Sequence, residues 1–282
     1  MKLISFEVAG QPSYGVVEGG GIIDLGRELG TRWPSLRHVL AAEGLAELGR
    51  AAQGRSADHS LGDVTFLPPI PNPAKIICVG MNYEPHRIEM GRDKDTYPTL
   101  FSRFTDCLVA HGQPIVRPRV SEKLDYEGEV ALVIGRGGRY IAEAHAFDHI
   151  AGYACFLDGS LRDYQAHTGQ VIAGKNFPRT GGFGPWMVTA DEAGDPAALE
   201  LTTRLNGEVM QKGRIDQLIY PIPELIAYIS QWTELAPGDV ISTGTPSGVG
   251  LARTPPVFMR AGDTIEVEIS RIGTLRHSII DE

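Results

Sequence analysis

Two glutamates at the start of an apolar segment are the residues in this chain best placed to do chemistry. Glu127 and Glu129 precede the strand-forming run Val130–Ile134. Residues i and i+2 of a strand point to the same face, so these carboxylates would repel each other unless a cation lies between them. Oxygen ligands favour Mg²⁺, Mn²⁺ or Ca²⁺ over Zn²⁺. A solvated strand edge with two glutamates explains the same pattern equally well.

A third carboxylate and a lysine follow along the chain. Asp158 comes directly after the apolar run Gly152–Leu157, at an expected strand end, although it could equally cap a helix that starts near Ser160. Lys175 lies in a stretch too broken for a long helix. Loop lysines are usually exposed to solvent, but in a site for an anionic substrate Lys175 would supply a counter-charge.

A histidine and a glutamate share one face of a short expected helix. Pro85 can open this helix and Gly91 can close it. His86 and Glu89 are then at positions i and i+3, where side chains can touch. A carboxylate beside an imidazole fixes its tautomer and raises its basicity, which suits a pair that activates water. A casual pair on an exposed helix is the alternative.

The segment Ser242–Gly250 is rich in glycine and hydroxyl residues. It lacks the lysine and the spacing of a phosphate-binding P-loop. Its backbone N–H groups could instead bind a carboxylate, or it could be a plain turn.

The elements that must position these residues form a β-rich α+β protein. Strands are predicted at Lys75–Val79, Val130–Ile134 and Thr264–Ser270, and Asn206-Gly207 predicts a tight hairpin. One helix is predicted from Pro223 to about Thr233. Strands and helices do not alternate regularly, which argues against a Rossmann fold or a TIM barrel.

The first 68 residues are predicted to form a small α/β domain of their own. Short β-like pieces between Lys2 and Leu25 are followed by an amphipathic helix from about Ser35 to Gln53. Four prolines in the seven residues Leu67–Pro73 indicate an extended linker. The expected domains are therefore residues 1–68 and 69–282.

Composition excludes several function classes. The chain has 282 residues, 42% hydrophobic residues and a formal net charge of −9, which argues against binding to nucleic acid or to an anionic membrane surface. No apolar run approaches the ~20 residues of a membrane span. The N-terminus has the pattern of a strand and not of a signal peptide, so a cytoplasmic location is expected. The three cysteines, Cys78, Cys107 and Cys155, lie far apart without a CxxC motif. Cys78 and Cys155 lie in apolar runs and are expected to be buried, inert thiols.

Taken together, the motifs resemble the fumarylacetoacetate hydrolase family. The resemblance extends roughly from Pro71 to the C-terminus. Its specificity comes from six runs in the family's order, which are Gly80–Glu89, Tyr126–Glu129, Asp158–Gln165, Gly174–Phe177, Gly184–Trp186 and Thr243–Gly250.

The resemblance implies a role for each site residue. It implies that Glu127, Glu129 and Asp158 hold Mg²⁺ or Mn²⁺, that His86 and Glu89 form a catalytic dyad, and that Lys175 faces the substrate. Thr245 and Gln165 are expected to contact the substrate. Arg103 stands where many members have lysine, so it is expected to bind an anionic group of the substrate. The implied fold is a mixed β-roll behind a small N-terminal domain, in a homodimer.

The implied function is hydrolysis of a carbon–carbon bond in an acylpyruvate-like 2,4-dioxo acid. The dyad would activate water, and a pyruvate enolate would leave. Two alternatives use the same chemistry: decarboxylation of an oxo acid such as oxaloacetate, and isomerisation or hydration of unsaturated 2-oxo dicarboxylic acids in aromatic catabolism. A binding protein on an inactive scaffold is disfavoured, because all the site residues are present.

Overall fold

A computed structural model describes all 282 residues, and its core is a twisted sheet of 12 strands. Two short strands lie beside its main path, β5 (Thr65–Phe66) next to β1 and β8 (Leu108–Val109) next to β14. The main path runs through β4 (His59–Ser60), β3 (Gly21–Asp24), β2 (Gln11–Glu18), β1 (Lys2–Val8), β14 (Gly181–Thr189), β12 (Ile150–Leu157), β11 (Gly128–Ile134), β17 (Val240–Ser242), β6 (Ile76–Gly80) and β7 (Thr99–Ser102).

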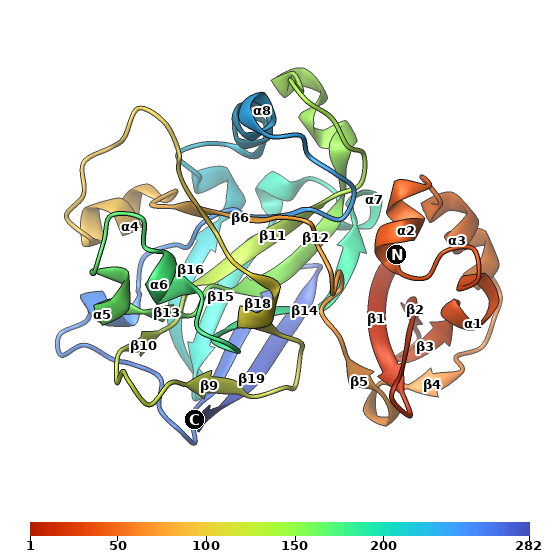
Figure 1. Cartoon of the computed structure of the whole chain (residues 1–282), viewed down its shortest axis with the longest axis horizontal. Coiled ribbons are helices and arrows are strands. Elements are labelled where there is room, and N and C mark those ends of the chain that lie inside the picture. Colours follow the sequence, from red (N-terminus) through yellow and green to blue (C-terminus); the bar gives the residue numbers. More distant parts are fainter.

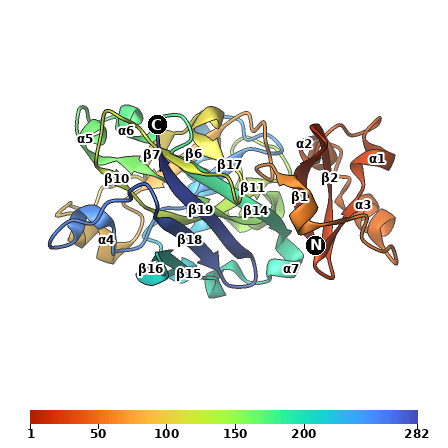
Figure 2. The same cartoon turned by 90° about the horizontal axis from the view of Figure 1, so that it is seen from below.

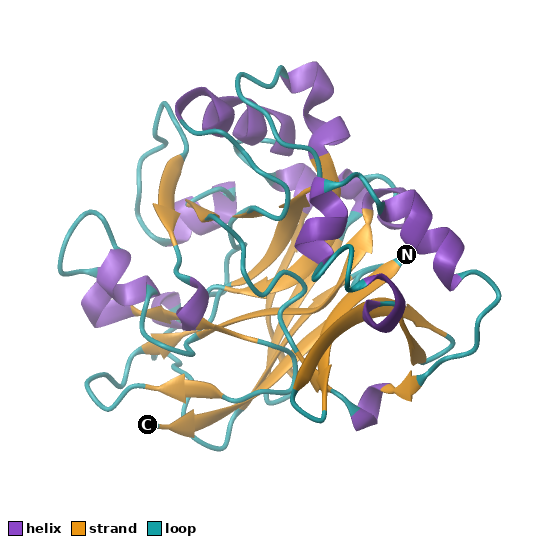
Figure 3. Cartoon of the chain, turned by 45° about the vertical axis from the view of Figure 1, so that its right-hand side comes forward, coloured by secondary structure: helices purple, strands orange, loops and turns teal.

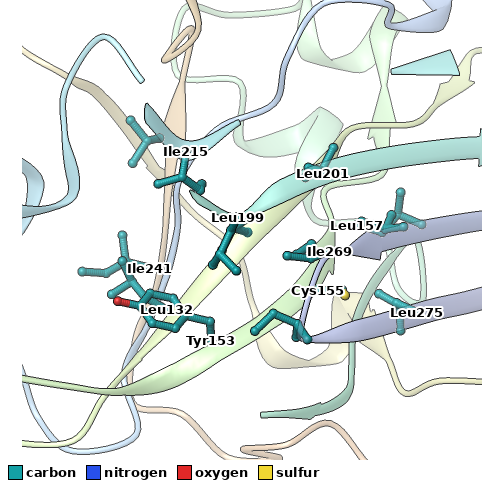
Figure 4. Packing of buried hydrophobic residues seen from close by; sticks show 14 of the residues in the cluster. Leu132, Tyr153, Cys155, Leu157, Leu199, Leu201, Ile215, Ile241, Ile269 and Leu275 are labelled. Carbon is teal, nitrogen blue, oxygen red and sulfur yellow. The ribbon is translucent and has the colours of Figure 1, made fainter. Parts of the chain in front are cut away.

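A five-stranded sheet packs against the middle of the first one. Its order is β16 (Glu208–Arg214), β15 (Glu200–Leu205), β18 (Thr264–Ile269), β19 (Gly273–Asp281) and β9 (Ile115–Arg117). Strands β18 and β19 contact β12 and β14, and a cluster of 39 buried residues lies between the sheets (Figure 4). The short strands β10 (Leu124–Asp125) and β13 (Ser160–Leu161) pair separately. The prediction of a strand-rich α+β fold is confirmed.

The central strand β11 is buried on both faces. Val130, Leu132 and Ile134 belong to the 39-residue cluster, whereas Ala131 and Val133 belong to a second cluster of 22 residues on the other face. A strand between two cores needs apolar side chains at every position, which explains its unbroken apolar run.

The helices are short and lie around the sheets (Figure 3). Near the N-terminus are α1 (Gly26–Leu29), α2 (Leu36–Ala41) and α3 (Leu45–Ala52), followed later by α7 (Ala190–Ala193) and α8 (Ile222–Trp232). Helices α4 (Glu84–Glu89), α5 (Arg162–Gln165) and α6 (Ile172–Lys175) lie at the end of the molecule opposite the N-terminal residues (Figures 1 and 2). Short 3₁₀ helices occur at Leu61–Asp63, Thr105–Cys107, Glu143–His149, Pro196–Ala198, Ile215–Gln217 and Gly250–Ala252.

The helix predicted from Ser35 to Gln53 is wrong as a single element. It is two helices, α2 and α3, because Glu43 adopts a φ of 52° and interrupts the helical backbone. Gly44 follows, and a Cβ at this glycine would lie 2.8 Å from the Trp33 ring. The break therefore lets the chain turn closely over a buried tryptophan.

The N-terminal residues share a sheet and a core with the remainder of the chain. Strand β1 pairs with β14 through Lys2↔Val188 and Leu3↔Met187. The 22-residue cluster contains Leu3 and Leu36 together with Cys78. The boundary between residues 68 and 69 stays a prediction, and a continuous sheet runs across it. The structure contains no helix of sufficient length and hydropathy to cross a membrane.

Candidate active site

Three carboxylates meet where β11 begins and β12 ends. These strands are antiparallel, with Gly128 opposite Leu157, and the amide of Asp158 donates to the carbonyl of Glu127 over 2.8 Å. Glu127 immediately precedes β11, Glu129 lies in β11, and Asp158 immediately follows β12. One oxygen from each carboxylate lies within 4.8 Å of the other two, and all three residues are buried. They are therefore not a solvated strand edge.

Lys175, the last residue of α6, bridges two of these carboxylates. Its Nζ lies 2.6 Å from Glu127 Oε2 and 2.6 Å from Asp158 Oδ2, and 4.9 Å from the centre of the Phe101 ring. Burial acts to lower the pKa of the Lys175 ammonium, but Asp158 and Glu127 outweigh it and hold that pKa above its ordinary value. Lys175 is therefore a buried cation and not a solvated loop lysine. Two of its three N–H donors are used, and the third remains.

Arg162 in α5 is a site residue that was not predicted from the sequence. Its Nη1 lies 2.7 Å from Glu127 Oε1, and its Nε lies 2.8 Å from Asp125 Oδ2. Its Nη1 also donates to Gln165 Oε1 over 2.9 Å, whereas its buried Nη2 has no partner. The sequence contains a signal for it, because Arg162 lies in the run Asp158–Gln165, which resembles the family.

The carboxylates differ in what neutralises them. Burial acts to raise the pKa of Glu127, but Lys175 and Arg162 outweigh it and hold that pKa below its ordinary value. Burial, Asp158 and Glu127 raise the pKa of Glu129 well above its ordinary value. Glu129 has no cationic partner and accepts only from Ser242 Oγ (2.5 Å) and the Gly244 amide (3.0 Å). A divalent cation among these oxygens would relieve that repulsion, so the donor set fits Mg²⁺ or Mn²⁺.

The segment 242–250 binds carboxylates of the protein itself. Besides Gly244, the amide of Gly248 donates to Glu89 Oε1 and that of Gly250 to Asp125 Oδ1, each over 2.8 Å. These three amides therefore hold carboxylates of the protein in position. The sequence had suggested that they could bind a carboxylate of the substrate, but they are already occupied.

The hydroxyl of Thr245 also has partners within the protein. Its Oγ1 donates to the carbonyl of Gly128 over 2.9 Å and accepts from Gln211 Nε2 over 2.8 Å. A substrate contact for Thr245 stays a prediction.

His86 and Glu89 form a contact within α4. His86 Nδ1 lies 3.1 Å from Glu89 Oε2, and His86 is only 2% exposed, so this pair is not a casual surface contact. Burial acts to raise the pKa of Glu89, but the hydrogen bonds from His86 and Gly248 hold it below its ordinary value. An ionised Glu89 requires the proton of neutral His86 to be on Nδ1, which leaves Nε2 as a base.

An open cavity of about 720 Å³ adjoins this site. Its lining includes Arg162 and Gln165 from the site, and Arg92, Asp93 and Asp95 from the segment after α4. A small acid could approach the carboxylates through it, past Gln165 at its wall, and a substrate contact for Gln165 stays a prediction.

Arg103 is not among the residues that line this cavity, and its expected contact with the substrate stays a prediction. The side chain has no exposed surface, and its guanidinium pairs with Asp158. In this structure the anionic group beside the guanidinium is therefore a carboxylate of the protein.

Comparison with known proteins identifies the family of this chain. Residues 75–280 match the family model of the fumarylacetoacetate (FAA) hydrolase C-terminal domain. The chain belongs to the fumarylacetoacetate hydrolase family. The family resemblance found in the sequence is confirmed.

Relatives in this family have different named reactions. Over 99% of its length the chain is 38% identical to the mitochondrial oxaloacetate tautomerase FAHD2A of Bos taurus, covering 92% of that protein. The fumarylacetoacetate hydrolase of Exiguobacterium antarcticum has a TM-score of 0.88 and 34% identity, with 100% of both chains covered. Maleylpyruvate hydrolase of Sphingobium sp. SYK-6, solved with manganese and pyruvate, has a TM-score of 0.83 and 32% identity, covering 100% of this chain and 99% of that one.

These findings support an enzyme of this family and leave its reaction to be proposed. The homodimer and the cytoplasmic location expected from the sequence stay predictions.

Proposed function

We propose that this protein moves a proton at the carbon next to the carbonyl group of a small 2-oxo acid, with keto–enol tautomerisation of oxaloacetate as the first candidate reaction. The observation that carries the proposal is the placement of Lys175 against Glu127 and Asp158, at 2.6 Å from each. The His86–Glu89 pair supplies a second proton-transfer group. The 38% identity with an oxaloacetate tautomerase over nearly the whole chain supports the choice of substrate.

Glu127, Glu129 and Asp158 are the residues that would hold a divalent metal ion. Such an ion supplies, when bound, a Lewis acid for the oxygens of a 2-oxo acid. The buried cations Arg162 and Lys175 keep the side chain of Glu127 ionised and in place, which prepares it as a ligand.

The two proton-transfer groups have complementary roles. His86 Nε2 takes the proton from the carbon, so the C–H bond breaks and its electron pair forms the new C=C bond. The third N–H of Lys175 donates to the carbonyl oxygen, which forms the enol O–H bond. The imidazolium then releases its proton and Lys175 regains one, so that neither group is consumed.

The test separates tautomerisation from decarboxylation. Purified protein with Mg²⁺ or Mn²⁺ is added to freshly dissolved enol-oxaloacetate, and ultraviolet absorbance follows the enol while an enzymatic assay measures total oxaloacetate. We expect the enol to disappear faster than in buffer with total oxaloacetate unchanged. Pyruvate formed at the rate of enol loss would show decarboxylation. No acceleration over buffer would contradict both.

Hydrolysis of an acylpyruvate is the second candidate, and the His86–Glu89 contact at 3.1 Å favours it. A base oriented by a carboxylate suits the activation of water, which tautomerisation does not need. Similarity to a maleylpyruvate hydrolase supports it as well. A coupled assay for pyruvate release from maleylpyruvate, fumarylpyruvate and acetylpyruvate tests it, and absence of pyruvate from all three would remove hydrolysis from consideration.

A further inference from the structure

Arg103 makes an unusually complete set of contacts for a side chain outside the substrate cavity. Its Nη1 donates to Asp158 Oδ1 and to the carbonyl of Gly159 (3.0 Å). Its Nη2 donates to Thr180 Oγ1 (3.2 Å), and its Nε donates to Cys107 Sγ (3.0 Å). All three guanidinium nitrogens are therefore held by different parts of the chain, and the side chain is fully buried.

The surroundings are shaped to accept a guanidinium. A Cβ at Gly181 would lie only 2.7 Å from Arg103 Nη2. The absence of a side chain at this position therefore provides the space for the planar, forked guanidinium group. The thiol of Cys107 donates to the carbonyl of Phe104 over 2.8 Å, which leaves its sulfur lone pairs to accept from Arg103. The hydroxyl of Thr180 similarly donates to the carbonyl of Phe177 over 2.7 Å and accepts from Arg103.

We propose that Arg103 is a positioning residue that sets the metal affinity of the site by fixing the carboxylate of Asp158. This inference rests on the proposed metal site. Asp158 has its two oxygens held by different cations, Oδ1 by Arg103 and Oδ2 by Lys175. Rotation of this carboxylate away from Glu127 and Glu129 would break one of these contacts. Partners that orient a ligand in this way commonly change metal affinity by about 10–100-fold when removed.

The planar fork explains why lysine would serve less well here. An ammonium is a single donor atom, so it could not reach Asp158, Thr180 and Cys107 at their observed separate positions around the guanidinium. Arg103→Lys keeps the positive charge and removes the fork. It therefore tests geometry separately from charge.

The experiment measures Mn²⁺ affinity directly, by electron paramagnetic resonance of free Mn²⁺. We expect Arg103→Lys to weaken Mn²⁺ binding by about 10–100-fold. Thr180→Val, which removes one partner of the fork, should weaken it less. Arg204→Lys is the matched control, because Arg204 pairs with Glu268 on the surface (2.5 Å), and it should bind Mn²⁺ like the wild type. Thermal unfolding of each metal-free variant checks that the fold is kept.

The outcomes are distinct. Unchanged Mn²⁺ affinity in Arg103→Lys and Thr180→Val would overturn the positioning role and leave the proposed function intact. A raised KM for the oxo acid at saturating Mn²⁺, with unchanged Mn²⁺ affinity, would overturn it in favour of a substrate contact. A wild-type protein that binds no Mn²⁺ would overturn the proposed metal site as well. Weakened Mn²⁺ binding with kcat recovered at high Mn²⁺ supports the inference.

Discussion

Lys175 Nζ lies 2.6 Å from Glu127 Oε2, whereas the adjacent carboxylate of Glu129 has no cationic partner. The surrounding charges therefore affect the ionised forms of these two glutamates in opposite directions. Glu127 is stabilised by its neighbours in the absence of metal, and Glu129 is destabilised by them. Substitutions at these positions should consequently have opposite effects on the metal-free fold.

Glu129→Gln should abolish tight metal binding without lowering the stability of the metal-free protein. The substitution removes a ligand, so Mn²⁺ affinity should fall by more than the roughly 10–100-fold expected for loss of a supporting partner. It also removes a carboxyl whose ionised form is disfavoured by burial and by the charges of Asp158 and Glu127, all of which raise the pKa of Glu129. Urea unfolding in EDTA measures stability, and titration with Mn²⁺ measures binding.

Glu127→Gln is the matched comparison at the neighbouring ligand. It removes the carboxylate that Lys175 and Arg162 share and leaves them Asp158 and Asp125 as buried counter-charges, so the metal-free protein should lose about 1.5–3 kcal/mol. If both substitutions changed the free energy of unfolding equally, the neighbouring charges would not affect Glu127 and Glu129 in opposite directions.

His86→Ala should keep the metal and lose turnover. His86 contacts Glu89 and is not among the three carboxylates, so Mn²⁺ affinity should stay within about twofold of the wild type. Loss of the general base should lower kcat by about 10²–10⁴-fold. Steady-state kinetics at saturating Mn²⁺ measure this loss. Full activity of the variant would show that the histidine is not the base.

Gly128→Ala should destabilise the strand that carries the two glutamates. A Cβ at Gly128 would lie 2.0 Å from Thr203 Oγ1 on the facing strand β15, and we expect this overpacking to cost about 1–3 kcal/mol. Thr203→Ala removes that oxygen, which has no hydrogen-bond partner, so the cost of Gly128→Ala should shrink in this background. A double-mutant cycle by urea unfolding checks this, and additive effects would argue against the contact.

The stability of the protein should fall between about pH 6.5 and pH 4 through His277. Burial, with a smaller effect of His111, lowers the pKa of His277 to about 4, while its Nδ1 lies 2.8 Å from the carbonyl of Gln113. In the unfolded chain this histidine has an ordinary pKa near 6.5. Between the two pKa values the unfolded chain therefore binds a proton at His277 and the folded chain does not. Stability is therefore lost as pH falls, by roughly 3 kcal/mol from this group.

His277→Asn tests that contribution, because asparagine keeps a donor for Gln113 and does not titrate. Its free energy of unfolding should depend less on pH over this interval than that of the wild type, measured by urea unfolding at several pH values. Identical pH profiles would mean that carboxylates account for the whole loss.

Much of the local structure was predictable because it depends on neighbouring residues. Asn206 and Gly207 have φ values of 53° and 82°, which is the hairpin turn that their residue types favour. The apolar run after Glu129 is a buried strand, as its composition predicted. At Glu43 the backbone has a positive φ that the apolar periodicity of the sequence does not reveal, so the predicted helix was too long.

The amino-acid sequence by itself determined the family, the strand-rich fold and the identity of the carboxylate, histidine and lysine groups. Only the tertiary structure decided which charges face each other. Arg103 and Lys175 lie 55 and 17 residues from Asp158 along the chain, yet both pair with it. Such pairs depend on how distant strands and loops pack, and packing is a property of the whole fold. That is why the pairing of Arg103 with Asp158, a ligand of the proposed metal site, could not be predicted from the sequence.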